Sequence, residues 1–328
     1  MIKVKLTYPF NWPIVKQTPH RSGKWGDCVF YINQDVEECD FWVVFEGLER
    51  NERTKCNPAN TLLVTAEPPT IKTYNTSFVD QFNWVLSCHD FKRANVIRSQ
   101  QGLNWMVGGC YQKDKHSWSE VHSKDYDELT SINQFDKTKL ISIVTSNKSL
   151  TDDHKARVRF INEARDLFGE ELDVFGVGFN EISDKWDAIY PYKYHIALEN
   201  SLIKDYWTEK LTDAFLGGAY PFYHGCPNID EYFPVSSLTP INIFNYHESL
   251  SEIAKVIKEN KYESSYDSIG TSRDLILNKF NLMAVLSEFC ELNSSAPSEK
   301  KKLSLFPERT FVKTNRFSLS NVKSFLFR

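Results

Sequence analysis

The 328-residue chain lacks the features that would tie it to an oxidising compartment or to a membrane. Its seven cysteines form no Cys-x-x-Cys pair and no spacing typical of a zinc site. No run of about 18 apolar residues occurs, so no membrane-spanning helix is predicted. The opening residues, MIKVKL, indicate a strand and not the apolar core of a signal peptide. We therefore expect reduced thiols and a cytoplasmic location.

An excess of charge of one sign is lacking as well. The chain carries 39 Lys and Arg against 43 Asp and Glu, which gives a formal net charge of −4. Because no basic excess is present to attract phosphates, no nucleic-acid partner is expected.

Apolar and aromatic residues, in contrast, are plentiful, at 41% and 14% of the chain. A chain of this length and composition usually forms two domains with cores of their own. We expect an N-terminal α/β domain in residues 1–130, a second α/β domain in residues 131–298 and a tail in residues 299–328. In the first domain, short apolar strands are expected at residues 2–8, 41–46, 61–66 and 83–88.

The second half shows a regular alternation of strand and helix. Residues 109–137 are polar and charged, and we expect a linker there with a short helix near Tyr126. Strands and helices alternate from Lys139 onward, and helical patterns follow at 248–259 and 272–291. Such alternation predicts a parallel sheet covered by helices.

The densest group of polar side chains lies inside a strand–helix–strand pattern at residues 194–227. Residues 196–198 predict a buried strand, Asp205 or Thr208 can cap the helix that follows, and the glycines at 217–218 end it. His195, inside the strand, is expected to be a satisfied buried histidine.

Glu209 and Lys210 fall in the first turn of this helix. Free backbone N–H groups and the helix dipole favour an anion there, and the lysine ammonium adds a positive charge. Open α/β sheets bind nucleotides and phosphates at such junctions. The sequence therefore predicts a phosphate-containing ligand.

The same segment resembles the donor-binding motif of glycosyltransferase family 10, the α1,3/α1,4-fucosyltransferases. In that family a strand ends in Glu-Asn, a variable loop leads to Tyr-x-Thr-Glu-Lys and a helix, and a Pro-containing strand leads to Gly-x-Pro. The corresponding pieces here are Leu198-Glu199-Asn200, Tyr206-Trp207-Thr208-Glu209-Lys210, Ala219-Tyr220-Pro221 and Gly225-Cys226-Pro227.

A second match lies upstream of the first. The family has a strand ending in Ser-Asn, followed by a helix whose arginine reaches the donor pyrophosphate. Residues 139–147 correspond to the strand, and the arginine corresponds to Arg157, with Arg159 as the alternative. The run LDVFGVG at 172–178 resembles the next strand and its glycine turn.

The resemblance implies a GT-B fold, in which two Rossmann-like α/β domains face an interdomain cleft. It implies an inverting enzyme that moves L-fucose from GDP-β-L-fucose to a hydroxyl of a glycan acceptor. An α1,3-type link on a bacterial surface polysaccharide or lipopolysaccharide is expected. Two alternatives stay open, namely another nucleotide deoxysugar as donor, and an inactive glycan- or nucleotide-binding protein.

No bound cofactor is expected, because GDP-fucose is a co-substrate. The chain has no Asp-x-Asp at a strand end, and Asp152-Asp153 lies in a polar stretch without that spacing. We expect no protein-held metal; a divalent ion could still stimulate activity without a site of its own. Lysine and arginine would take its place against the pyrophosphate.

The resemblance also assigns the site residues. Arg157 and Lys210 would stabilise the departing nucleotide diphosphate. The donor would be bound by Glu199, Asn200, Tyr206, Glu209, Lys210 and Arg157. Structural roles remain open for several of them: Asn200 could close an Asx-turn, Tyr206 could pack on the helix, Glu209 could favour its dipole, and Arg157 could form a surface ion pair.

The general base is expected from the N-terminal domain. Glu67 follows the apolar strand that ends at Val64, and a carboxylate at the carboxyl end of a strand faces a crevice. Its Ala-Glu-Pro-Pro context departs from the family pattern, and it could equally be a capping or solvent-facing residue. His89 and Asp90 are the alternative, with a role on the acceptor side.

The tail combines basic and aromatic residues. Residues 299–328 hold eight Lys or Arg against two Glu, interleaved with Leu and Phe. This composition suits peripheral contact with an anionic membrane, here the inner membrane. Packing back onto the N-terminal domain is the open alternative.

Overall fold

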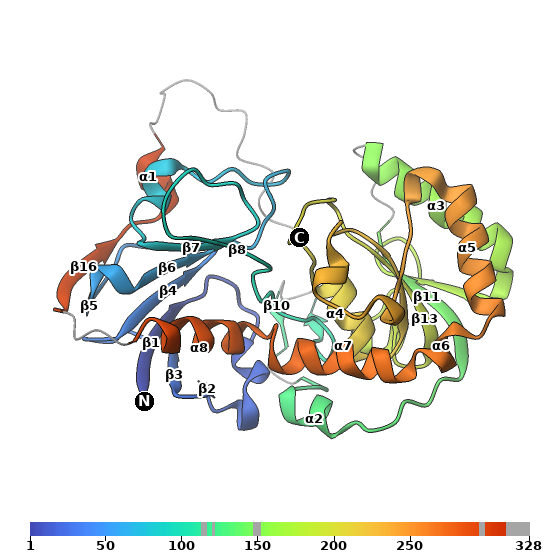
Figure 1. The fold of residues 1–328 in the computed structure, drawn as a ribbon, viewed down its shortest axis with the longest axis horizontal. Helices are drawn as coiled ribbons and strands as arrows, with labels where there is room; N and C mark the ends of the chain where they lie inside the picture. The colour runs from blue at the N-terminus through green and yellow to red at the C-terminus, as the bar shows by residue number, and fades with distance from the viewer. Residues whose placement is uncertain (113–116, 120–121, 147–151, 295–298, 313–328) are drawn as a thin grey trace.

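The computed structural model describes residues 1–112, 117–119, 122–146, 152–294 and 299–312. This part of the chain forms two α/β units, each built on its own sheet (Figure 1). The predicted α/β class with two Rossmann-like units is confirmed.

The N-terminal sheet has seven strands in the order β2-β3-β1-β4-β6-β7-β8. Neighbours pair in parallel, except that β2 is antiparallel to β3. The strands are β1 Ile2–Thr7, β2 Lys24–Trp25, β3 Cys28–Ile32, β4 Phe41–Phe45, β6 Thr61–Val64, β7 Trp84–Ser87 and β8 Val96–Arg98. The four strands predicted here form within two residues of their expected bounds.

The second sheet has five parallel strands in the order β12-β11-β13-β14-β15. These are β11 Lys139–Val144, β12 Leu172–Phe175, β13 Tyr192–Leu198, β14 Tyr220–His224 and β15 Thr239–Pro240. Because parallel strands bring their carboxyl ends to one edge, the loops after β11, β13 and β14 share an edge.

Helices cover the sheets. They are α1 Thr76–Val79, α2 Tyr126–Ser131, α3 Asp152–Phe168, α4 Glu209–Leu216, α5 Tyr246–Lys258, α6 Lys261–Ser264, α7 Tyr266–Asn278 and α8 Leu282–Leu292. Helix α4 packs against β13, β14 and α7. The strand–helix–strand unit predicted at 194–227 is therefore present as β13, α4 and β14. Two short antiparallel pairs, β5 Glu52–Cys56 with β16 Lys301–Leu305 and β9 Tyr111–Gln112 with β10 Ser117–Trp118, complete the fold.

His195 is a satisfied buried histidine, as predicted. Ser142 Oγ donates to the carbonyl of Ala188 at 2.6 Å, so the His195 Nδ1–H donates to Ser142 Oγ, at 2.9 Å. Burial lowers the pKa of His195 to about 3, which keeps the ring neutral at pH 7.

The prediction of one continuous helix at 272–291 is wrong, because the structure has two helices there. Helix α7 ends at Asn278, and Asn281 caps α8 by accepting the N–H of Met283 at 3.1 Å. The Asn281 amide also donates to the carbonyls of Gln17, at 2.8 Å, and Leu277, at 3.1 Å. These bonds favour a break, since they fix Asn281 in an extended conformation that a helix cannot contain.

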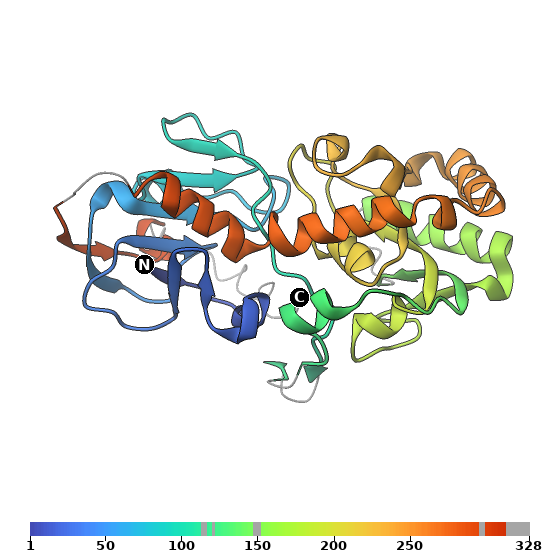
Figure 2. The ribbon, with the colours of Figure 1, turned by 60° about the horizontal axis from the view of Figure 1, so that its bottom comes forward.

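After this break the chain returns to the first unit. Figures 1 and 2 show α8 lying against the N-terminal sheet and α7 against the second unit. Leu282, Met283 and Leu286 are fully buried in the same core as Val4 and Leu6 of β1. The return occurs before residue 298, where we expected the second domain to end.

The first part of the tail also packs on the N-terminal unit. Strand β16 pairs with β5. Lys300 Nζ lies 2.7 Å from Asp40 Oδ1 and 2.9 Å from Glu38 Oε1. Residues 313–328 lie outside the described residues, so membrane contact through them stays a prediction. In the part of the chain that the structure describes, no helix has both the length and the apolar character needed to cross a bilayer.

We predict that Leu286→Ala lowers the free energy of unfolding by about 2–5 kcal/mol, because it opens a cavity between α8 and the N-terminal sheet. Leu292→Ala, on the same helix but 74% exposed, should change it by less than about 0.5 kcal/mol. Urea unfolding of both variants measures this, and equal effects would contradict the packing of α8 described above.

Candidate active site

Helix α4 begins at Glu209 because Thr208 caps it. The Thr208 side chain accepts the N–H of Lys210 at 3.3 Å. Glu199 holds Thr208 in turn, since its Oε1 accepts the Thr208 N–H at 2.7 Å and its Oε2 accepts the Thr208 hydroxyl at 2.8 Å. Of the two predicted caps, Thr208 is the one observed. Glu209 and Lys210 occupy the first turn of the helix, as predicted.

Lys210 lies between two carboxylates. Its Nζ is 3.3 Å from Glu209 Oε1 and 3.6 Å from Glu199 Oε2. Burial lowers the pKa of Lys210, but Glu209 and Glu199 outweigh burial and hold it above its ordinary value. Burial disfavours the charged form of Glu209 as well, which for a carboxyl raises the pKa, but Lys210 and Lys185 outweigh burial and lower the pKa to about 2. Lys210 and Glu209 are therefore both charged at neutral pH.

Two residues that sequence reasoning missed extend this charged group. Lys185 Nζ lies 3.6 Å from Glu209 Oε1 and 3.2 Å from Asp213 Oδ2. The buried Asp213 accepts the N–H groups of Met106, at 2.8 Å, and Val107, at 3.2 Å. Asp213 thus bonds α4 to the segment after β8, through which the chain leaves the N-terminal unit. Asp213 lies four residues after Glu209, and side chains at this spacing share one face of a helix, so the sequence could have indicated that the two lie side by side. No sequence pattern pointed to Lys185.

Arg157, on α3, comes together with Asn200. It is 9% exposed, and its guanidinium donates to Asn200 Oδ1 at 3.3 Å and to Ser146 Oγ at 3.5 Å. Among the described residues no carboxylate pairs with it and its Nε has no partner. Burial lowers the pKa of Arg157, although a guanidinium stays charged. Its charge is thus not offset by a described neighbour. Asn147 of the upstream motif lies outside the described residues.

Arg159, the alternative to Arg157, is engaged elsewhere. Its Nη2 donates to the hydroxyl of Tyr246 at 2.5 Å, and its guanidinium lies 4.4 Å from the centre of that ring. This contact on α5 favours Arg157 as the donor-side arginine.

Glu67, the predicted base, is brought towards the donor-side residues. Thr70 and Ser201 share a hydrogen bond of 2.6 Å between their hydroxyls, so the loop after β6 contacts the loop after β13. The Glu67 charge contributes to raising the pKa of the buried Tyr206, after burial and Glu199, and it adds to the effect of Glu209 and Glu199 in raising the pKa of Lys210. The Thr70–Ser201 bond thus brings the loop that carries Glu67 to the loop that leads to α4.

The backbone around Glu67 is fixed on both sides. The N–H of Ala66 donates to Glu46 Oε2 at 2.7 Å, and the carbonyl of Glu67 accepts the His89 Nε2–H at 2.8 Å. Burial lowers the pKa of His89, and its ring stacks on Phe91 at 5.3 Å. His89 thus positions Glu67 through its carbonyl, and its predicted role on the acceptor side stays a prediction.

Glu46 is a further residue that the sequence analysis missed. Besides Ala66, its carboxylate accepts the Lys72 ammonium and the Tyr74 hydroxyl, each at 2.6 Å. Its φ of 64° is unusual for a residue with a side chain. Glu46 directly follows β4 much as Glu67 follows β6, so the strand-end rule that selected Glu67 could have selected it.

Asp90 lies in a surface network. It is more than half exposed and pairs with Lys92 and Arg98. Over the described ranges, no group of three His, Cys, Asp or Glu side chains is arranged to hold a metal ion.

Two α/β units, each built on a sheet of mostly parallel strands, are the arrangement of GT-B glycosyltransferases. The family model described as glycosyltransferase family 10 (fucosyltransferase), C-terminal part, matches residues 134–307, more than half of the chain. The chain belongs to this family.

Curated relatives are named as fucosyltransferases or as fucosyltransferase-like. The 4-galactosyl-N-acetylglucosaminide 3-alpha-L-fucosyltransferase 9 of Mus musculus is 37% identical over 139 residues, which is 40% of this chain and 36% of the relative. The Homo sapiens protein of that name gives the same values. A putative fucosyltransferase-like protein of Arabidopsis thaliana is 34% identical over 79 residues, 24% of this chain and 14% of that protein. The chain thus spans about a third of the length of the first relatives.

Solved structures show a weaker likeness. An alpha1,3-fucosyltransferase with GDP matches with a TM-score of 0.46 at 15% identity, over 86% of this chain and 92% of that chain. The same class of protein with GDP-fucose matches with a TM-score of 0.46 at 16% identity, over 85% and 90%.

We predict that Glu46→Gln speeds amide hydrogen exchange in residues 65–75 by about tenfold or more. A carboxamide cannot accept three donors as a carboxylate does, and a weakened charged hydrogen bond costs about 1.5–3 kcal/mol. Glu37→Gln, at an exposed ion pair with Lys55, is the control and should leave this exchange unchanged. Unchanged exchange in both variants would show that Glu46 does not hold the loop.

Proposed function

We propose that the protein transfers L-fucose from GDP-β-L-fucose to a hydroxyl of a glycan acceptor, with inversion at the fucose carbon. The observation that carries this proposal is the 2.6 Å hydrogen bond between the hydroxyls of Thr70 and Ser201, because it joins the loop that carries Glu67 to the loop that leads to the Tyr-x-Thr-Glu-Lys residues at the start of α4. Membership of the fucosyltransferase family supports a fucosyl transfer. One of the similar solved structures is an alpha1,3-fucosyltransferase with GDP-fucose.

The leaving group in this reaction is GDP, whose negative charge grows as the bond to fucose breaks. Arg157 and Lys210 stabilise that charge, together with the N–H groups at the start of α4. Arg157 contributes most, because the Lys210 ammonium is already offset by two carboxylates. Asn200, Tyr206 and Glu209 complete the donor site, and Glu199 acts by holding Thr208.

The acceptor hydroxyl attacks from the side opposite the leaving group. Glu67 takes its proton as the new bond forms, which is the role of the base in an inverting transfer. The bond from the Ala66 N–H to Glu46 and the bond from His89 to the Glu67 carbonyl hold the backbone that carries this carboxylate.

We further propose an α1,3-type link, as in the names of the mouse and human relatives, on a bacterial surface polysaccharide or lipopolysaccharide. The protein would act in the cytoplasm at the inner membrane, where contact through the tail would bring it to lipid-linked glycans. A divalent ion would stimulate the reaction without a protein site.

We predict that Lys210→Ala weakens GDP binding by about tenfold or more, since it removes a charge-assisted contact to phosphate. Calorimetry measures the dissociation constant. A thermal-shift screen with GDP, UDP, CDP and dTDP shows which nucleotide, and so which nucleobase, the protein prefers. Lys204→Ala removes a 64% exposed lysine of the same loop and should leave binding unchanged. Full stabilisation by GDP in Lys210→Ala would contradict the phosphate contact.

We predict that Glu67→Gln lowers kcat for fucosyl transfer by about 10²–10⁴-fold, the usual contribution of a general base, with GDP affinity unchanged. Asp90→Asn is the comparison, and a loss of the same size there would favour the alternative base. Transfer and hydrolysis assays over a panel of nucleotide sugars identify the donor. GDP binding without transfer to any acceptor would instead support an inactive binding protein.

A further inference from the structure

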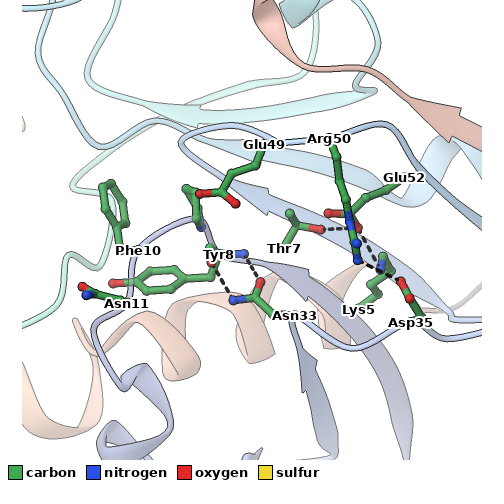
Figure 3. A pocket seen from close by; sticks show the side chains of 11 residues that line it. Lys5, Thr7, Tyr8, Phe10, Asn11, Asn33, Asp35, Glu49, Arg50 and Glu52 are labelled. Atoms are coloured by element: carbon green, nitrogen blue, oxygen red, sulfur yellow. Dashed lines mark hydrogen bonds and ion pairs between the residues drawn. The ribbon is translucent and has the colours of Figure 1, made fainter. Parts of the chain in front are cut away.

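A pocket of about 270 Å³ lies in the N-terminal unit outside the carboxyl end of β1 (Figure 3). Loops that follow β1, β3 and β4 line it, together with residues of β1 and the start of β5. It is separate from the α4 region, which belongs to the second sheet.

The position of this pocket is the one at which open α/β sheets bind ligands. Strand β1 has β3 on one side and β4 on the other, so the chain reverses direction across the sheet between β3 and β4. The crevice outside the carboxyl ends of the strands at such a reversal is the usual place for a ligand.

The floor of the pocket carries charges that are already paired. Lys5 Nζ lies 2.9 Å from Glu52 Oε2, and the Thr7 hydroxyl donates to the same oxygen at 3.0 Å. Lys5 is buried, and the start of β5 holds Glu52 over it. The floor is thus polar but electrically balanced.

One wall is an exposed aromatic ring held in place by two others. Phe10 is 44% exposed, and its ring packs edge-on against Tyr8, with centres 5.4 Å apart, and against Phe45, at 6.0 Å. Asn33 fixes the Tyr8 backbone by accepting its N–H at 2.8 Å and donating to its carbonyl at 2.7 Å. The pocket therefore presents an apolar ring whose orientation is set in advance.

The rim is polar and of mixed sign. Arg50 and Asp35 lie 3.7 Å apart on the surface, and the Glu49 carboxylate lies towards the Phe10 side of the pocket (Figure 3). With Lys5 and Glu52, the lining has two positive and three negative side chains, which disfavours a phosphate or another anion. An aromatic ring with carboxylates, amides and a guanidinium around it suits a neutral ring that carries hydroxyls on its edge and C–H groups on its face.

The pocket adjoins the loop of the predicted base. Phe45, against which Phe10 packs, is followed by Glu46, which accepts the N–H of Ala66 next to Glu67. Strands β1 and β6 are both neighbours of β4, which places their ends about 10 Å apart.

We propose that this pocket binds a sugar unit of the acceptor glycan other than the unit that receives fucose. The proposal rests on the proposed function for the identity of the ligand as an acceptor. It assigns Phe10 as the stacking surface and Arg50 as a donor to sugar hydroxyls, and it explains why the hydrophobic ring of Phe10 is exposed.

The test is a binding measurement on the full chain with GDP present. The probes are a neutral tetrasaccharide that ends in 4-galactosyl-N-acetylglucosaminide and that terminal disaccharide alone, followed by ligand-observed NMR titration. Phe10→Ala should weaken tetrasaccharide binding by about tenfold, and Arg50→Ala by several-fold, with disaccharide and GDP affinities unchanged. Tyr266→Ala, which removes an aromatic ring of similar exposure (39%) from α7, is the matched control and should change none of these.

Equal tetrasaccharide affinity in Phe10→Ala and the unaltered chain would overturn the proposal, and so would the absence of tetrasaccharide binding to the unaltered chain. A circular dichroism melt of each variant confirms that it is folded. If the tetrasaccharide binds through Phe10 but no nucleotide sugar supports transfer, the proposed function fails and the saccharide site stands.

Discussion

The pair of hydrogen bonds between the Glu199 carboxylate and Thr208 is the constraint on which the candidate site depends. These bonds join the end of β13 to the residue before α4 and so fix where the helix begins. The position of Lys210, its distance from Glu209 and the direction of the free N–H groups all follow from that starting point. Since Glu199 is buried with both oxygens engaged, its contribution is to geometry, while Asn200 beside it faces Arg157.

The site contains cations in two different electrostatic states. Lys210 and Lys185 lie among the acidic side chains of Glu199, Glu209 and Asp213, and burial raises the pKa of Glu199 and of Asp213. Arg157 has no described carboxylate partner and is largely buried. An incoming diphosphate therefore gains most from Arg157, whereas the lysines keep the acidic cluster from repelling it.

The sequence predicted what depends on neighbours along the chain. The β13-α4-β14 unit, its cap and its first-turn residues are local, because a helix start needs only a capping side chain and a periodic apolar face. The single helix expected at 272–291 failed for a non-local reason, since Asn281 bonds to Gln17, far away in the sequence. Lys185 could not be assigned a role for the same reason, since its partners come from another element. Glu46 could have been selected by its place after β4, but its bond to Ala66 in the loop after β6 could not have been foreseen.

The placement of α8 has a consequence for how the chain acquires its structure during synthesis. The N-terminal sheet buries one face against Leu282, Met283 and Leu286, which leave the ribosome after the entire second sheet. Domains made of one continuous stretch can fold in the order of their synthesis, N-terminal first. Here the first sheet has to wait with apolar side chains of β1 and β4 uncovered, so the second unit is the one that can complete its core earlier.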